Sequence, residues 1–273
     1  MAAPWIDADY MHYLDTTPKA FGTKVAFGYR HDPTPIVEAG LGGFGSVEGG
    51  IFRASARATV RHPLKAFLLS CHRLTAATAP TDFTLYYGGA TGAYDFTMLT
   101  AENDSWNLTW GVEDPLKIAY AFNGLCATEA ATGDTQEAVV AGITDAWSEC
   151  DVLIQTADYI AKRLSITCTN GARVGSSLDR RSAGYYRLPP YIRSGRPTWA
   201  ISVRTRNRIP AATLGLDTDT YLSNRGITAI STNLSLTLSN LHCTGETHDA
   251  TRGDFGEWEY GFNTHLWTPL AIT

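Results

Sequence analysis

Two pairs of adjacent residues place a thiol beside an imidazole, Cys71-His72 and His242-Cys243. A cysteine and a histidine together can form a nucleophilic dyad, and with the histidines further along the chain they could bind a soft metal. However, the spacing matches no ligand framework, and neighbours on a strand point to opposite faces, which would separate His242 from Cys243. We therefore expect these side chains to be packed or exposed rather than catalytic.

The other candidates for chemistry are a glycine-rich stretch and a set of acids and aromatics. Gly40–Gly45 fits the nucleotide-binding pattern GxGxxG, but residues 46–52 oppose the helix that must follow it. The C-terminal part holds residue types that a glycosidase uses: Asp217, Asp219, Asp254, Glu257, Glu259, Trp258, Tyr260 and Trp267. Acidic pairs in turns and alternating aromatics are more often structural. We predict no catalytic site, no cofactor and no bound metal, so the chain is not expected to be an enzyme.

Charged residues are sorted along the chain. Between Arg173 and Arg208 there are nine arginines, no lysine and one acid, so this segment carries +8 and the remainder −13, given a total of −5. Residues 118–161 hold seven acids and no base. Arginine and tyrosine are enriched in subunit interfaces, where lysine is depleted, and opposite patches set the register of association. A solvated basic face and a binding site for single-stranded nucleic acid are the alternative interpretations.

We favour the interface. In residues 203–208, strand alternation would place three arginines on one face, as a ladder for carboxylates of a neighbouring copy. The predicted interface residues are Arg180, Arg181, Arg187, Arg193, Arg196, Arg204, Arg206, Arg208, Glu137, Asp145 and Glu149.

The elements that must position these residues are mostly strands. Apolar residues alternate with polar ones through 83–123, with a turn at Gly88-Gly89 and a hairpin signal at Asn123-Gly124. Two segments, 63–74 and 134–150, have the three- and four-residue spacing of helices. We expect a mainly β fold, a sandwich or barrel of antiparallel strands with one or two flanking helices.

Two long connections are rich in Gly, Pro, Ser and Tyr, residues 28–50 and 171–198. Loops of this length are uncommon in compact domains unless they have a function, and reaching across to another chain is a natural one. We therefore expect one unit, 1–273, with these two segments as inter-subunit loops. The alternative is two tandem domains, about 1–128 and 129–273.

Several stretches together point to a known family. Val25–Arg30 (VAFGYR) precedes a glycine-rich stretch, and GSVE begins at Gly45. Paired β-runs follow at 165–171 and at 230–240, the second punctuated by serine and asparagine. With these runs, the sorted charges and a flanking helix at 134–150, the chain resembles the tail tube proteins of long-tailed bacteriophages.

That resemblance implies a ring-forming β-sandwich subunit whose rings stack into a hollow tube for genome ejection. It implies hexameric rings, or trimeric rings of a tandem subunit, assembled in the host cytoplasm into the virion tail. The implied partners are further copies of the chain, a tape-measure protein, and the tail terminator and distal tail proteins. DNA would be present only in transit, so we expect the arginine-rich segment to face protein rather than the lumen.

Composition excludes other classes. With 44% hydrophobic and 18% charged residues the chain is globular rather than disordered. We expect no membrane span and no Sec-type signal, because no apolar run is long enough. The five cysteines form no CxxC pair, and we expect them to be reduced core residues. A carbohydrate-binding β-sandwich or glycosidase is the alternative to the tube subunit.

Overall fold

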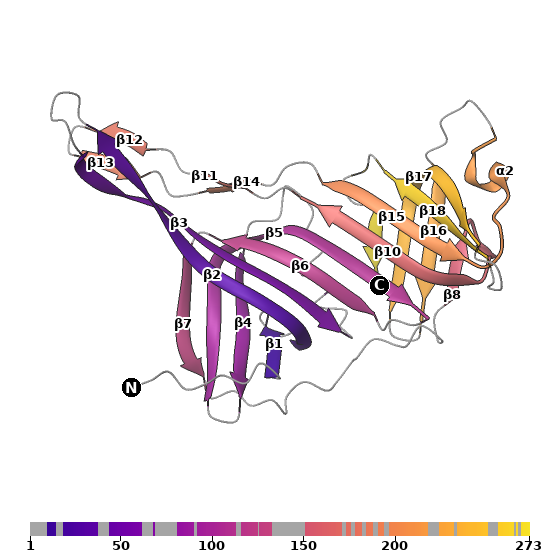
Figure 1. The fold of residues 1–273 in the computed structure, drawn as a ribbon, viewed down its shortest axis with the longest axis horizontal. Helices are drawn as coiled ribbons and strands as arrows, with labels where there is room; N and C mark the ends of the chain where they lie inside the picture. Colours follow the sequence, from indigo (N-terminus) through magenta and orange to yellow (C-terminus); the bar gives the residue numbers. More distant parts are fainter. Residues whose placement is uncertain are drawn as a thin grey trace.

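A computed structural model confirms a mainly β, antiparallel protein (Figure 1). It describes residues 10–14, 19–37, 44–61, 68, 81–89, 92–112, 116–124, 126–132, 151–170, 173–175, 178–181, 184–187, 191–193, 197–217, 224–231, 234–250, 256–264, 266 and 269–273. Within these ranges no helix has the length and apolar character to span a bilayer.

The strands fall into two groups along the chain. The first group is β1 (Tyr10–Leu14), β2 (Lys19–Val37), β3 (Phe44–Arg61), β4 (Thr81–Gly89), β5 (Gly92–Gly111), β6 (Lys117–Gly124) and β7 (Cys126–Thr132). The second is β8 (Asp151–Ile154), β9 (Ala157–Asp158), β10 (Ala161–Thr169), β11 (Arg173–Gly175), β12 (Leu178–Arg181), β13 (Gly184–Arg187), β14 (Tyr191–Arg193), β15 (Thr198–Thr205), β16 (Arg225–Ile230), β17 (Ser235–Asp249), β18 (Glu257–Asn263) and β19 (Leu270–Ile272). A short helix, α2 (Ala211–Leu214), follows β15.

Six strands of the first group form a closed hydrogen-bonded circuit. β1 pairs with β2 and β4, β3 with β2 and β6, and β5 with β4 and β6. The circuit closes because β5, with 20 residues, pairs its first half with β4 and its second half with β6. Alternation along β6 buries Ile118, Tyr120 and Phe122, as the sequence pattern predicts. This part of the fold is a small barrel.

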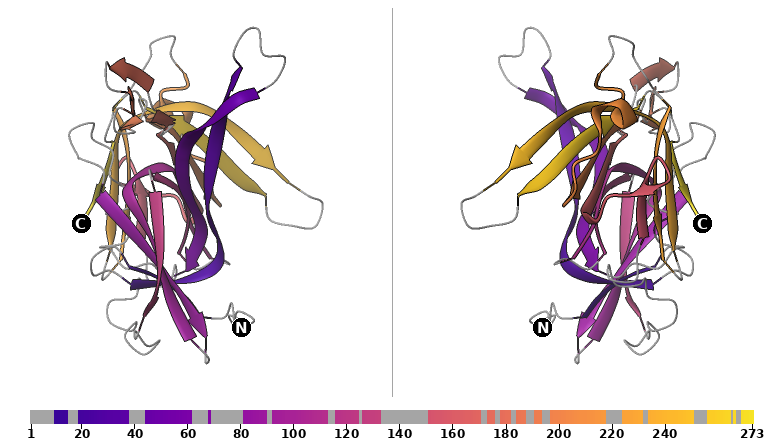
Figure 2. Two further views of the ribbon diagram at one scale, coloured as in Figure 1. Left: turned by 90° about the vertical axis from the view of Figure 1, so that its left-hand side faces the viewer. Right: turned by 90° about the vertical axis from the view of Figure 1, so that its right-hand side faces the viewer.

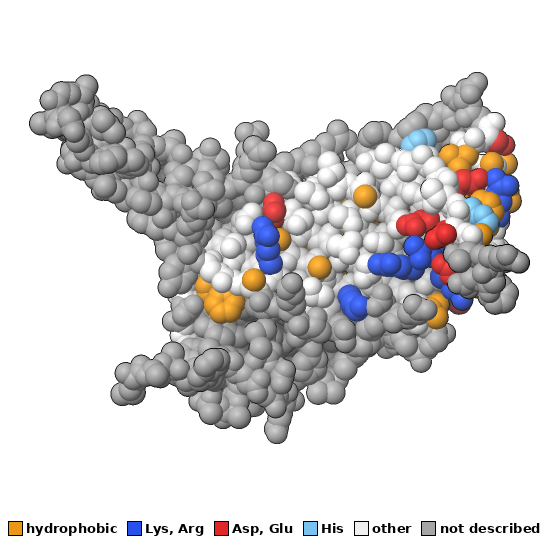
Figure 3. Space-filling model, in the orientation of Figure 1, with side chains coloured by type: hydrophobic (Ala, Val, Ile, Leu, Met, Phe, Trp, Pro, Cys, Tyr) orange, Lys and Arg blue, Asp and Glu red, His pale blue; other side chains and the backbone are white. Residues whose placement is uncertain are grey.

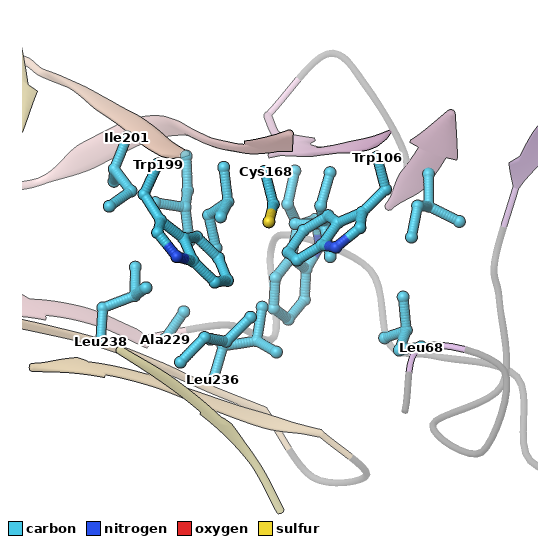
Figure 4. Packing of buried hydrophobic residues seen from close by; sticks show 14 of the residues in the cluster. Leu68, Trp106, Cys168, Trp199, Ile201, Ala229, Leu236 and Leu238 are labelled. Carbon is cyan, nitrogen blue, oxygen red and sulfur yellow. The ribbon is translucent and has the colours of Figure 1, made fainter. Parts of the chain in front are cut away.

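The second group forms a sandwich. The first half of β17 pairs with β16 and β19, and its second half pairs with β18 in the other sheet. Asn240 has a positive φ of 55° where β17 passes from one sheet to the other. Trp199, Cys168 and Ile201 of one sheet face Ala229, Leu236 and Leu238 of the other (Figure 4). The core therefore lies between two layers, as in other β-sandwiches.

The two groups share one sheet, because β5 pairs with β10 from Gly111 opposite Arg163 to Ser105 opposite Thr169. On the solvent side of this junction, the amide of Asn107 donates to the hydroxyl of Thr167 at 2.6 Å and to that of Ser165 at 3.4 Å. On the core side, the rings of Trp106 (β5) and Trp199 (β15) meet edge to face, with centroids 5.6 Å apart. Side chains of both groups thus fill one core.

Only part of the helix prediction is described. Leu68, within the predicted helix 63–74, is helical and buried. The rest of that segment and the predicted helix 134–150 lie outside the described residues. The sequence pattern missed α2, whose Leu214 is buried and whose end is marked by Gly215 in the left-handed conformation (φ 73°).

The hairpin turn predicted at Asn123-Gly124 is wrong. β6 ends at Gly124, and the chain continues in the same direction as β7, which pairs with the first half of β5 (Leu99 opposite Cys126). β6 and β7 therefore lie end to end along one edge of β5. The turn predicted at Gly88-Gly89 is misplaced: both glycines are the last residues of β4, and Gly89 faces Gly92 across the β4–β5 hairpin, so the connection comes after them.

Candidate assembly surfaces

Within the segment 28–50, expected as a loop, residues 28–37 and 44–50 are instead the outer part of a β-ribbon. β2 and β3 pair as far as Val37 opposite Phe44. Beyond Phe21, β2 pairs with no described strand other than β3, and before Ala54, β3 pairs with none other than β2. The ribbon extends from the barrel as an arm (Figure 1). Both of its outer edges thus present main-chain donors and acceptors, which is the typical template for pairing with another chain.

The segment 171–198 contains a second arm built of short strands. β11 pairs with β14 (Arg173 opposite Arg193), and β12 pairs with β13 (Leu178 opposite Arg187). Both arms extend toward the same end of the molecule (Figure 1). Arg180, Arg181, Arg187 and Arg193 lie on these strands, with side chains outside the described part. Arg196, Glu137, Asp145 and Glu149 lie wholly outside the described residues.

The predicted arginine ladder holds for only one of its three residues. β15 ends at Thr205, so strand alternation places Arg204 on the outer face but does not reach Arg206 and Arg208. The Arg204 guanidinium lies 3.2 Å from Glu259, directly across the β15–β18 pair, and 3.5 Å from Glu257. Its carboxylate partners therefore come from its own chain, because β18 presents two acids to this face.

Arg208 is also bound within the chain. It donates to Glu246 of β17 at 2.6 Å, and its guanidinium lies 4.9 Å from the ring centroid of Trp258. The hydrogen bond and charge of Glu246 raise the pKa of Arg208. His248 stacks on the same indole at 4.2 Å. Trp258 is therefore occupied by two of its own chain's side chains, and Tyr260 is fully buried, which leaves neither as an open platform for a sugar ring.

These charged contacts form one cluster. Figure 3 shows acidic and basic side chains gathered over β15, β17 and β18 at the end away from the arms, while the middle of this face carries few charges. The ions of the cluster are part-exposed, with Arg204 at 42% and Arg208 at 56% side-chain exposure, so each pair contributes little to stability. The cluster leaves Arg204 and Arg208 paired with acids of their own chain.

Cys168 and Cys243, the cysteines whose side chains are described, are buried and unsuited to nucleophilic chemistry. Burial raises the pKa of Cys168 to about 12, and burial likewise raises the pKa of Cys243. Cys243 points inward from β17 whereas His242 lies on the opposite, part-exposed face, as strand alternation predicts. In the described part of the chain, no three His, Cys, Asp or Glu side chains gather where they could hold a metal ion.

Sequence reasoning missed the feature that the fold makes most prominent, the unpaired strand edges. Sequence reasoning also left unused a short repeat, YAFN at 120–123 and YGFN at 260–263, which stand 140 residues apart. Comparison with known proteins adds no relative: the chain matches no family model, and no curated protein matches it.

Proposed function

We propose that this chain is the structural subunit of a viral tail tube, which assembles with copies of itself into stacked rings around a conduit for DNA. The observation that carries the proposal is the β2–β3 ribbon, whose outer edges pair with no described strand beyond the barrel. In a monomeric protein, a long ribbon with unpaired outer edges would promote aggregation. In an assembly, the same edges can form the interface between copies.

The charge cluster supports the same proposal. A tube that conducts DNA must not hold phosphates tightly, and Arg204 and Arg208 are already paired with acids of their own chain. Phosphate affinity rises with the number of cations available to displace counterions, so neutralised arginines contribute little to it. We retain the proposal that residues 204–208 face protein, and an assembled tube with these arginines lining its lumen would overturn it.

The test shortens the arm without disturbing the barrel. His31 and Phe52 face each other across β2 and β3, so replacing residues 32–51 by Asn-Gly closes a two-residue hairpin there. Negative-stain microscopy of the full chain at high concentration should show rings or tubes. The shortened variant should form no tubes and should keep the circular dichroism spectrum of a folded β protein.

Two results would contradict the proposal. One is a full-length chain that stays monomeric at every concentration tested, and monomers that bind members of a glycan array would favour a carbohydrate-binding protein. The other is a shortened variant that still forms tubes, because the arm would then not be a contact that tube formation needs.

A further inference from the structure

The two groups of strands pair in the same order. The correspondence is β1 with β8, β2 with β10, β3 with β15, β4 with β16, β5 with β17, β6 with β18 and β7 with β19. The pairs β1–β4, β2–β3, β3–β6, β4–β5, β5–β6 and β5–β7 recur as β8–β16, β10–β15, β15–β18, β16–β17, β17–β18 and β17–β19. The chain therefore contains the same supersecondary unit twice, in residues 10–132 and 151–272.

Irregularities in the ladders recur at matching places. The β5–β6 register shifts between Asn103 and Ser105, and the β17–β18 register shifts between Cys243 and Gly245. In both cases the residue before the shift faces the phenylalanine of a Tyr-x-Phe-Asn sequence. The β2–β3 and β10–β15 ladders each shift near their start as well, at Gly22/Lys24 and at Ala161/Arg163. Bulges are specific features of a fold, so these matches align the two units residue by residue.

The pairing that joins the two units has no counterpart within the chain, and β1–β2, which closes the barrel, recurs in no pairing of β8 with β10 among the described strands. The second half of β5 pairs with β10 and so joins unit one to unit two. In the alignment of the two units, residues 105–110 of β5 correspond to residues 245–250, along β17. Residues 164–169 of β10 correspond to residues 25–30 of β2. Among the described strands, neither segment pairs with anything on the edge that corresponds to this junction.

Burial agrees with an uncovered edge. Leu108 and Trp110 of β5 are 1% and 0% exposed, whereas the aligned His248 and Ala250 are exposed. The β17–β18 hairpin stands out from the body in both views of Figure 2. A side chain added at Gly245 would meet no atom within 4 Å.

Resting on the proposed function, we infer that β17 of one copy pairs antiparallel with β2 of the next copy, in the register that joins β5 to β10. Thr109 faces Ser165 and Asn107 faces Thr167 within the chain, so Asp249 would face Ala26 and Thr247 would face Gly28 between copies. The two edges also carry opposite charges, with Asp249 on β17 and Lys24 and Arg30 on β2.

This contact is heterologous, because it joins two different edges. Each added copy leaves one edge of each kind available until a ring closes. The inferred contact between copies has the same strand pairing and register as the β5–β10 contact within the chain. A ring of such copies would therefore contain twice as many units as chains. The curvature of the assembly sets the number of copies in a ring. Native mass spectrometry measures that number.

A disulfide tests the register. Residues directly opposite in an antiparallel pair have Cα atoms about 4.5–5.5 Å apart, within reach of a disulfide. Ala26→Cys with Asp249→Cys should therefore give covalently linked oligomers on mild oxidation, with the linked peptides identified by mass spectrometry. The control, Ala26→Cys with Ala250→Cys, should give none, because adjacent residues of a strand point to opposite faces. Thr109→Cys with Ser165→Cys should link within single chains and shows that the oxidation conditions suffice.

Hydrogen exchange provides a test on the native chain. Amides of 25–30 and 245–250 should exchange at least about tenfold more slowly in the assembly than in the dilute monomer. Rings without this protection or without the Ala26–Asp249 link would overturn the inference and leave the proposed tube subunit standing. Equal linking of the control pair would also overturn it. A chain that forms no assembly at all would overturn both.

Discussion

Replacing Trp199 by alanine should destabilise both halves of the molecule together. The side chain is 4% exposed, lies between the two sheets and meets Trp106 of the other group edge to face (Figure 4). Truncating a buried tryptophan costs about 3–5 kcal/mol of unfolding free energy, which is a large part of the roughly 5–15 kcal/mol typical of folded proteins. At roughly 2–4 °C per kcal/mol for chains approaching this size, the melting temperature should fall by roughly 6–20 °C.

The assay is urea denaturation followed by circular dichroism and by fluorescence. Because both groups share the β5–β10 sheet and one core, the two signals should report a single transition in the native protein and in the variant. A double-mutant cycle with Trp106→Ala should give a coupling energy of about 0.5–1.5 kcal/mol for the edge-to-face contact. The exposed Ile230→Ala, which should change stability by less than about 0.5 kcal/mol, is the control.

Two results would refute this reasoning. A loss below about 1 kcal/mol for Trp199→Ala would mean that the side chain does not fill the core. Zero coupling with Trp106 would mean that the two rings do not touch, and the halves would then be joined by the strand pairing alone.

Three further predictions concern polar groups. Asn107→Ala should lower the free energy of unfolding by about 1–3 kcal/mol, because two hydrogen bonds across β5–β10 are lost. In a double-mutant cycle with Thr167→Ala, part of this loss should appear as a coupling energy between the two residues. Additive losses would contradict the contact. Arg208→Ala should leave the urea midpoint nearly unchanged, because its pair with Glu246 is part-exposed; a large shift would show that the pair is structural. Burial raises the pKa of Cys168 from 9.0 to about 12, so its thiol ionises in the unfolded chain first, and the contribution of Cys168 to stability should be constant below pH 9 and fall between pH 9 and 12. The unfolding free energy of the native protein should fall more steeply than that of Cys168→Ala, by up to about 1.4 kcal/mol per pH unit. Equal slopes in the two proteins would contradict the cause.

Strand patterning predicted the body of the fold but not its edges. Alternation identified β6 because one face of that strand is buried. The Asn123-Gly124 signal failed because a dipeptide reports local turn propensity, whereas β5 is long enough to pair with β6 and β7 in succession. Residues 28–50 were expected as a loop because their prolines and glycines interrupt the pattern. In the fold the interruptions are register shifts, one of them at Pro33, where a strand tolerates a missing N–H donor.

The charged contacts were beyond sequence reasoning for a different reason. Arg204 and Glu259 are 55 residues apart, and Arg208 and Glu246 are 38 apart. The excess of arginine was visible in the sequence, but nothing local specifies which acids face it, because that depends on the order of strands in the sheet. The strand order in turn follows from long-range pairing, which periodicity does not encode.

The β5–β10 junction affects how quickly a closed ring of copies can form. Two units on one polypeptide meet at an effective concentration of the order of millimolar, set by the connecting chain rather than by protein abundance. Half of the joints in a ring would then form during folding of each chain, and only the other half would need diffusional encounters. A duplicated subunit would thereby halve the number of separate molecules whose translational freedom is lost on closure.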